Sequence, residues 1–291
     1  MVANRRQLTC QKDKFSLPAD IHYLNCATRR PFSRAVEEAG VAAISRQTNP
    51  FSLTATHFFE QPMRVRQLFS GLISNRNSET QGSGTVDPDR IAVVPSVSYA
   101  MGVVARNLHR KRGALVCVGY KWLMGPYSTG LAYFGEAFDE GIPLEETWMA
   151  RVNSEQFHRL TEYQPMYRPK AYRYNVGEQS HFIHMPMLEA SLDQLTHWKP
   201  ETIQAYARDL MADALTDLEA VGCRVEDAPW RSHHLLGLWL PNTAHPVAVQ
   251  QALLARKVSV SVRGRALRVS PNVYNDQNDV DAFVAVLKES L

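Results

Sequence analysis

The chain has 291 residues, 45% of them hydrophobic, so it can hold one large or two moderate domains with a substantial core. Its 32 basic residues against 29 acidic ones give a net charge of +3, too even a balance for nucleic acid as the main partner. No run of 18 apolar residues occurs, and the first residues lack the apolar stretch of an export signal. We therefore expect small-molecule chemistry, without membrane insertion or export.

The four cysteines, Cys10, Cys26, Cys117 and Cys223, are scattered without C-x-x-C spacing. This pattern favours neither a zinc site nor a disulfide framework, and a reducing cytoplasm is the expected location. His181 and His184 are three residues apart, but no third ligand accompanies them, so no metal site is expected.

The N-terminal part predicts a short strand, residues 21–24, followed by a turn at Asn25. Asn25 either caps this turn or faces a ligand, and the cap is favoured because Asn is a common turn residue. Pro31 suits the first position of a helix that runs to about Arg46, and a second helix is expected over residues 61–72. A polar linker follows, residues 75–84.

The next segment reads as strand, polar turn and helix, with Ser96 and Ser98 where the helix begins. Their hydroxyls and the free backbone N–H groups there could hold a phosphate, or Ser96 could simply be the N-cap. After a basic loop, residues 109–113, the apolar residues 114–118 predict a buried strand. This order predicts a right-handed, parallel βαβ crossover.

Lys121 follows that strand directly, after Gly119, and stands between Tyr120 and Trp122. A lysine at the end of a buried strand and ringed by aromatic side chains would be partly desolvated, which favours the neutral amine and carbonyl chemistry. The alternative is a surface lysine in a turn.

Beyond the lysine, residues 130–134 predict a strand, residues 138–151 look irregular, and residues 185–198 predict a helix. Tyrosines and prolines between residues 163 and 180 disfavour a regular element. Such a segment either lines a pocket or packs against a core.

The last third predicts a small α+β domain. Its expected elements are helices over residues 201–221, 246–257 and 279–289 and strands over residues 223–225, 235–240, 258–262 and 266–270. Strict alternation in the last strand places Arg268 on the face opposite Leu267 and Val269.

Five motifs occur in one order along the chain. They are Tyr23-Leu24-Asn25-Cys26-Ala27 with Pro31, the Ser96-Val97-Ser98 turn, Gly119-Tyr120-Lys121-Trp122-Leu123-Met124-Gly125-Pro126 with Gly130, Arg173-Tyr174-Asn175-Val176-Gly177, and Leu267-Arg268-Val269-Ser270-Pro271 with Tyr274-Asn275. Together they resemble the class V aminotransferase family of pyridoxal-phosphate enzymes, which includes cysteine desulfurases and isopenicillin-epimerase-like proteins.

The resemblance implies a role for each motif. Lys121 would form a Schiff base with pyridoxal 5'-phosphate and act as the catalytic lysine, and Ser96, Val97, Ser98 and Tyr120 would hold the phosphate. Arg268, with Asn25, would bind the carboxylate of an amino-acid substrate. Gly177 would approach the cofactor of a second subunit, which implies a homodimer.

The resemblance also implies an α/β fold of the pyridoxal-phosphate transferase type I. A large domain over residues 31–185 would carry a mainly parallel, doubly wound sheet, and residues 1–30 with 186–291 would form the α+β small domain. The large domain is expected to be incomplete, because the family has several further βα units where this chain has only residues 108–114. Asp87, Asp89 and Asp139 do not stand at the strand end where the family places the partner of the ring nitrogen.

Two functions remain open from the sequence. One is a transaminase, epimerase or lyase acting on an amino acid through Lys121. The other is a catalytically impaired relative, internally deleted, that retains only dimerisation and weak phosphate binding. The motifs do not distinguish transamination from epimerisation, desulfuration or elimination, and they do not name the amino acid.

Overall fold

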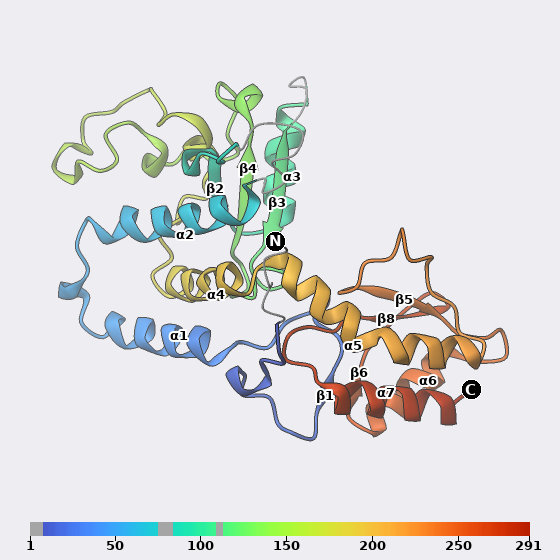
Figure 1. The fold of residues 1–291 in the computed structure, drawn as a ribbon. Coiled ribbons are helices and arrows are strands. Elements are labelled where there is room, and N and C mark those ends of the chain that lie inside the picture. The colour runs from blue at the N-terminus through green and yellow to red at the C-terminus, as the bar shows by residue number, and fades with distance from the viewer. Residues whose placement is uncertain (1–7, 75–83, 109–112) are drawn as a thin grey trace, which may run out of the picture. The chain divides into compact units, whose positions relative to one another are not determined.

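The computed structural model describes residues 8–74, 84–108 and 113–291, so the expected linker and basic loop lie largely outside the described residues. The chain divides into two compact units, a smaller one of residues 1–34 with 198–291 and a larger one of residues 35–197 (Figure 1). The large domain expected from the sequence, residues 31–185, begins four residues before the larger unit begins and ends twelve residues before that unit ends.

Helix α4 (His184–Trp198) accounts for the later second boundary. It packs inside the larger unit, so closely that a Cβ atom at Gly125 would lie 2.8 Å from Leu188 Cδ1. Most of a helix that we assigned to the small domain therefore belongs to the compact unit that carries the lysine motif.

Three further helices build the larger unit: α1 (Arg34–Gln47), α2 (His57–Ile73) and α3 (Val97–Arg106). The expected helix over residues 61–72 begins four residues earlier, at His57. The buried face of α2 includes Val65 and Phe69, the apolar spacing of an amphipathic helix, together with Arg66.

The sheet of the larger unit has the order β2 (Ile91–Val94), β4 (Gly130–Phe134), β3 (Ala114–Val118). Both outer strands pair antiparallel with β4. Strands β2 and β3 thus run in the same direction, but β4 lies between them. The predicted βαβ crossover between two neighbouring parallel strands is therefore corrected. The order of elements along the chain could not show that β4 returns between them.

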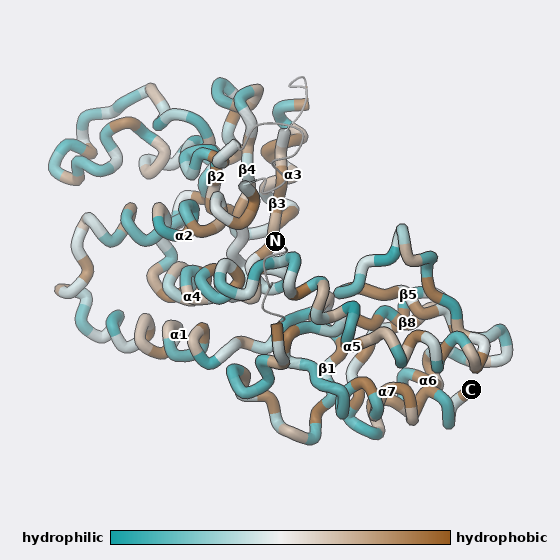
Figure 2. The backbone as a smooth tube through the Cα atoms, in the orientation of Figure 1, coloured by the Kyte–Doolittle hydropathy of each residue, from teal (hydrophilic) through white to brown (hydrophobic). Residues whose placement is uncertain are grey.

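Strand β3 is an edge strand of this sheet rather than a buried one. Ala114 is exposed and Leu115 is 47% exposed, whereas all four residues of β2 are buried. Figure 2 shows hydrophobic residues along β3. The prediction of a buried strand is therefore wrong for its first half, because an apolar run does not reveal whether a neighbouring strand covers it.

The other edge of the sheet, at β2, is covered by the tyrosine-rich segment. Val176 N donates to Val93 O at 3.0 Å, and Val93 N donates to Asn175 Oδ1 at 2.8 Å. A short 3₁₀ helix (Lys170–Tyr174) precedes this contact, so the segment is irregular as expected.

The smaller unit contains a sheet of order β5 (Leu236–Trp239), β8 (Ala266–Val269), β7 (Ser261–Arg263) and a parallel pair, β1 (His22–Tyr23) with β6 (Val258–Ser259). Helices α5 (Pro200–Ala220), α6 (Pro246–Ala255) and α7 (Gln277–Glu289) complete it. Two predictions are corrected: residues 258–262 form two strands with different partners, and residues 223–225 form only one isolated bridge, between Arg224 and Trp239.

The core of the smaller unit is formed by the apolar stripes predicted for its last strand and helices. Leu267, Phe283 and Leu218 are fully buried within it. The alternation of β8 thus places its apolar face inward, and Arg268 is left on the other face, partly exposed.

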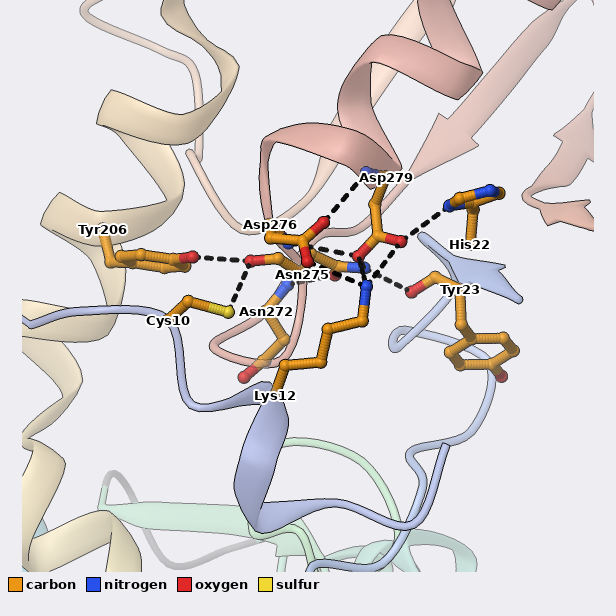
Figure 3. A network of polar contacts seen from close by, with 9 residues as sticks. All are labelled: Cys10, Lys12, His22, Tyr23, Tyr206, Asn272, Asn275, Asp276 and Asp279. Carbon is orange, nitrogen blue, oxygen red and sulfur yellow. Dashed lines mark hydrogen bonds and ion pairs between the residues drawn. The ribbon is translucent and has the colours of Figure 1, made fainter. Parts of the chain in front are cut away.

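An ion-pair network attaches the N-terminal segment to the start of α7 (Figure 3). Lys12 Nζ lies 3.0 Å from Asp276 Oδ2 and 3.1 Å from Asp279 Oδ1, and His22 Nδ1 lies 2.8 Å from the same Asp279 oxygen. Asp276 caps the helix and forms a capping box with Asp279. The buried carboxylate of Asp279 therefore links strand β1 and the N-terminal segment to α7.

No helix in the described part of the chain is long and apolar enough to cross a membrane.

Candidate functional site

The strand register brings two of the sequence motifs to one end of the larger unit's sheet. Gly130, the first residue of β4, pairs with Val94 at the end of β2 on one side and with Val118 at the end of β3 on the other. Neighbouring strands lie about 5 Å apart, so these two strand ends are about 10 Å apart. The Ser96 turn and the Lys121 turn begin there, at the carboxyl ends of β2 and β3, where open α/β sheets bind ligands.

Ser96 is the N-cap of α3. Its Oγ accepts a hydrogen bond from Tyr99 N at 3.1 Å, which confirms the capping alternative. Val97 is 39% exposed and Ser98 is also exposed. The backbone N–H groups of a first helical turn have no acceptor within the helix, so the start of α3 retains donors for an anion.

Close packing around Gly119 shapes the turn that carries Lys121. Gly119 N donates to Thr129 O at 2.7 Å and Gly125 N donates to Gly119 O at 2.8 Å. A Cβ atom at Gly119 would lie 2.8 Å from Pro126 O, so only glycine fits there. The turn is thus fixed by backbone contacts on both sides of the lysine.

Lys121 itself is partly buried, and its Nζ lies 5.5 Å from the centroid of the Tyr120 ring. The Tyr120 ring in turn packs on Tyr127, with centroids 4.3 Å apart. Within the described parts of the chain, Lys121 makes no ion pair with a carboxylate. The amine therefore faces an aromatic ring and is left available for chemistry.

Gly177 lies beside the β2 edge, where its N–H donates to Glu145 Oε2 at 2.7 Å. It lines a cavity of about 440 Å³ with aromatic walls that include Phe58, Trp148 and Phe182. Its predicted approach to a second subunit's cofactor stays a prediction.

The tyrosine-rich segment both lines a cavity and packs into the core, the two alternatives that the sequence left open. Tyr163 and Tyr167 line a second cavity, of about 600 Å³, whereas Tyr172 and Tyr174 are buried.

In the smaller unit, Asn25 and Arg268 belong to one hydrogen-bonded cluster. Arg268 Nε donates to Ser261 Oγ at 3.1 Å, and Arg268 Nη2 donates to Thr28 Oγ1. Thr28 Oγ1 and Ser261 Oγ both donate to Asn25 Oδ1, at 2.8 and 3.3 Å. The two residues that the resemblance assigned to the substrate carboxylate are thus joined through two hydroxyl groups.

Arg268 is held by hydroxyls and makes no ion pair among the described residues. Burial, with the nearby charge of Arg263, lowers its pKa from the usual arginine value. A carboxylate ligand would neutralise this charge and accept its remaining N–H groups, so the cluster fits an anionic group.

Sequence reasoning missed Thr28 and Ser261, although a signal for Ser261 was present. A two-residue turn at Gly264-Arg265 pairs Arg263 with Ala266, and counting back places Ser261 opposite Arg268, as the structure shows. Thr28 had no such signal, because its contact depends on the tertiary position of the Asn25 turn.

The three aspartates considered for a ring-nitrogen partner lie at the wrong end of the sheet. Asp139 pairs with Arg90 at 2.8 Å, just before β2 begins, and Asp89 accepts from Tyr172 Oη at 3.1 Å beside it. Asp87 pairs with Lys170 there as well. Strand β2 separates this group from the end of the sheet where the Lys121 turn begins.

His181 and His184 stack face to face, with ring centroids 3.6 Å apart. Among the described residues, no group of three or more His, Cys, Asp or Glu side chains is arranged to hold a metal ion.

No family model matches the sequence, and no curated protein matches it. Solved structures do match the fold. The chain has the fold of the pyridoxal-phosphate transferase type I class, as expected from its motifs, and the similarity extends over nearly its full length.

Three of these solved structures illustrate the similarity. The cysteine desulfurase CsdA of Escherichia coli is 13% identical with a TM-score of 0.75, and the match covers 96% of this chain and 97% of that one. A cysteine desulfurase from Thermococcus onnurineus is 12% identical with a TM-score of 0.77, covering 97% and 98%. The cystine C-S lyase C-DES, solved with its product cysteine persulfide, is 12% identical with a TM-score of 0.70, covering 94% and 98%. At this identity the comparison establishes the fold.

Proposed function

We propose that this protein is a pyridoxal-phosphate-dependent enzyme that acts on an amino acid, with Lys121 as the residue that holds the cofactor covalently. The observation that carries the proposal is the strand register. It sets Lys121 and the N-terminus of α3 at the carboxyl ends of two strands that flank β4.

The residues of the larger unit fit the two reactive ends of this cofactor. The start of α3, with Val97 and Ser98 exposed, would bind the phosphate, and Tyr120 would add a phosphate contact. Lys121 has no competing carboxylate among the described residues and would later move a proton at the substrate α-carbon. When bound, the cofactor supplies the electron sink for that chemistry.

The smaller unit would supply substrate recognition. Arg268 would bind the substrate carboxylate through its planar guanidinium, with Thr28 and Ser261 holding the side chain in position. Asn25 orients both hydroxyls and would act through them.

The reaction type is proposed from the similar solved structures. They are cysteine desulfurases and a C-S lyase, so we propose cysteine and cystine as the first substrates to test. The chain's own cysteines support lyase chemistry more than persulfide transfer, because Cys26 and Cys223 are buried and Cys10 and Cys117 are partly buried.

The test is spectroscopic. Purified protein incubated with pyridoxal phosphate should acquire a visible absorption band that Lys121→Ala abolishes and Lys288→Ala retains. Lys288 is a matched control because it is an exposed lysine paired with Asp217. Equal bands in all three proteins would contradict the role of Lys121.

An impaired relative that retains dimerisation and weak phosphate binding is the second candidate. The exposed edge at β3 and the misplaced aspartates favour it. A band that no amino acid shifts would support this candidate, whereas a shift with cysteine or cystine would support the enzyme. The expected homodimer is tested by light scattering, and a monomer would contradict it.

A further inference from the structure

The outer edge of strand β3 presents a row of backbone hydrogen-bonding groups. At one end of the strand, Gly119 N donates to Thr129 O at 2.7 Å. Every second residue of an antiparallel ladder bonds to the same neighbour, so the odd-numbered residues of β3 bond to β4. In the described part of the chain no strand pairs with the other side of β3. The N–H and C=O groups that point to that side belong to Ala114, Val116 and Val118.

Strand β3 also lacks the features that protect an edge strand from pairing. Its five residues, Ala114–Val118, include no charged residue and no proline, and Leu115 is 47% exposed. Native edge strands usually carry a lysine, a proline or a bulge that prevents another strand from adding to them. The β3 edge is therefore open to pairing with a further strand through backbone hydrogen bonds.

Helix α3 adds apolar side chains next to this edge. It packs on β3 (Figure 1), Met101 is 52% exposed, and Leu108, just after the helix, is 75% exposed. One side of α3 faces the covered β2 edge, where Tyr99 Oη donates to Asn175 O at 3.4 Å. Met101 lies about 160° around the helix from Tyr99, because each residue adds about 100°. The exposed apolar side of α3 is thus turned away from β2, toward the free edge of β3.

We propose that the β3 edge and the Met101 side of α3 form an interface with a second copy of this chain, through antiparallel pairing of the two β3 strands about Val116. In this register Val116 lies opposite its own equivalent, and the outward N–H and C=O groups of each copy meet their complements in the other.

The symmetry of this pairing favours a second copy over an isolated extended peptide. The two-fold axis is perpendicular to the sheet, so both α3 helices lie on the same face and their Met101 sides face each other across the seam. A second copy would therefore satisfy the backbone edge and cover the exposed apolar side chains at once, whereas a peptide would pair only with the strand.

The proposed interface is at the edge of the sheet opposite the β2 edge, beside which Gly177 lies. It does not depend on the proposed function or on a cofactor. Association through β3 and the expected contact at Gly177 can therefore fail separately.

The first test is sedimentation velocity of the full chain over a range of concentrations. We expect reversible self-association that Met101→Glu weakens at least about tenfold, because the seam would bury two carboxylates. Leu254→Glu is the matched control, since Leu254 is on helix α6 of the smaller unit and is 53% exposed. It should associate as the unmodified protein does. A monomer at about 100 μM, or association that Met101→Glu leaves unchanged, would overturn the proposal.

The second test checks the register. Pairing about Val116 sets residue 115 of one copy opposite Cys117 of the other as a non-hydrogen-bonded pair, with Cα atoms about 4.5 Å apart, which a disulfide can span. Leu115→Cys treated with oxidised glutathione should give a covalent dimer linked between position 115 and Cys117 of the other copy, identified by peptide mass spectrometry. Leu254→Cys, treated in the same way, should not. No covalent dimer, or one linked only through other positions, would overturn the proposed pairing.

Discussion

At the residue scale, Gly119 is the position where the backbone around Lys121 tolerates least change. The Cβ of an alanine would meet Thr129 Oγ1 at 2.7 Å, Pro126 O at 2.8 Å and Thr129 O at 2.9 Å. Two of these are backbone atoms that cannot rotate away, so the turn itself would have to shift. We expect Gly119→Ala to lower the free energy of unfolding by about 1–3 kcal/mol, measured by urea denaturation, and to impair cofactor binding.

Gly71 provides the matched control, since a Cβ there meets nothing within 4 Å and the residue is in helix α2. Gly71→Ala should raise stability by about 0.5–1 kcal/mol, because alanine favours helix. Equal effects of the two substitutions would contradict the packing described for Gly119.

His184 gives a prediction on pH. Burial, followed by the neighbouring His181, lowers its pKa from the usual histidine value to about 4. Between about pH 6.5 and pH 4, His184 is therefore protonated in the unfolded chain but neutral in the folded chain. The free energy of unfolding should fall as the pH falls through this range, because protons bind preferentially to the unfolded state. His184→Gln should flatten that fall in thermal unfolding experiments, whereas His197→Gln, at an exposed position, should not. An unchanged pH profile in His184→Gln would contradict the assignment.

At the scale of elements, the attachment of the N-terminal segment to α7 depends on Lys12. Asp279, 1% exposed, accepts from Lys12, and removal of that donor leaves a buried carboxylate with fewer partners. We expect Lys12→Met to destabilise the protein by about 1–3 kcal/mol in urea denaturation.

Lys257→Met is the control, because Lys257 pairs with Asp20 where both side chains are more than half exposed. Its expected cost is about 0–1 kcal/mol. A comparable loss in both variants would show that the buried network adds nothing beyond a surface ion pair.

Sequence patterns predicted the helices better than the strand partners. The stripe with Ile203 and Leu218 identified α5 almost to its ends, because one helix buries one face whatever it packs against. Strand β3 could not be placed in the same way. Its apolar residues are compatible with a buried strand, and only the sheet order shows that one edge is exposed. Likewise the parallel direction of β2 and β3 followed from the connection, but the position of β4 between them did not.

At the scale of the whole molecule, part of the candidate site could be predicted and part could not. The order of five motifs along the chain predicted the fold class, which solved structures of 12–13% identity confirm. It also named Asn25 and Arg268, but not the hydroxyls of Thr28 and Ser261 that join them. The burial of Arg66, which lies outside this site, was also not predicted, since an arginine within a helix stripe gives no sequence sign that it is buried.

The central claim is that Lys121 anchors a pyridoxal cofactor, and borohydride reduction tests it most directly. Protein loaded with pyridoxal phosphate is reduced, digested and analysed by mass spectrometry. We predict a stable phosphopyridoxyl group on the peptide that contains Lys121, at near-stoichiometric yield, and its loss in Lys121→Ala. An unlabelled Lys121, or label spread evenly over exposed lysines such as Lys257 and Lys288, would contradict the account.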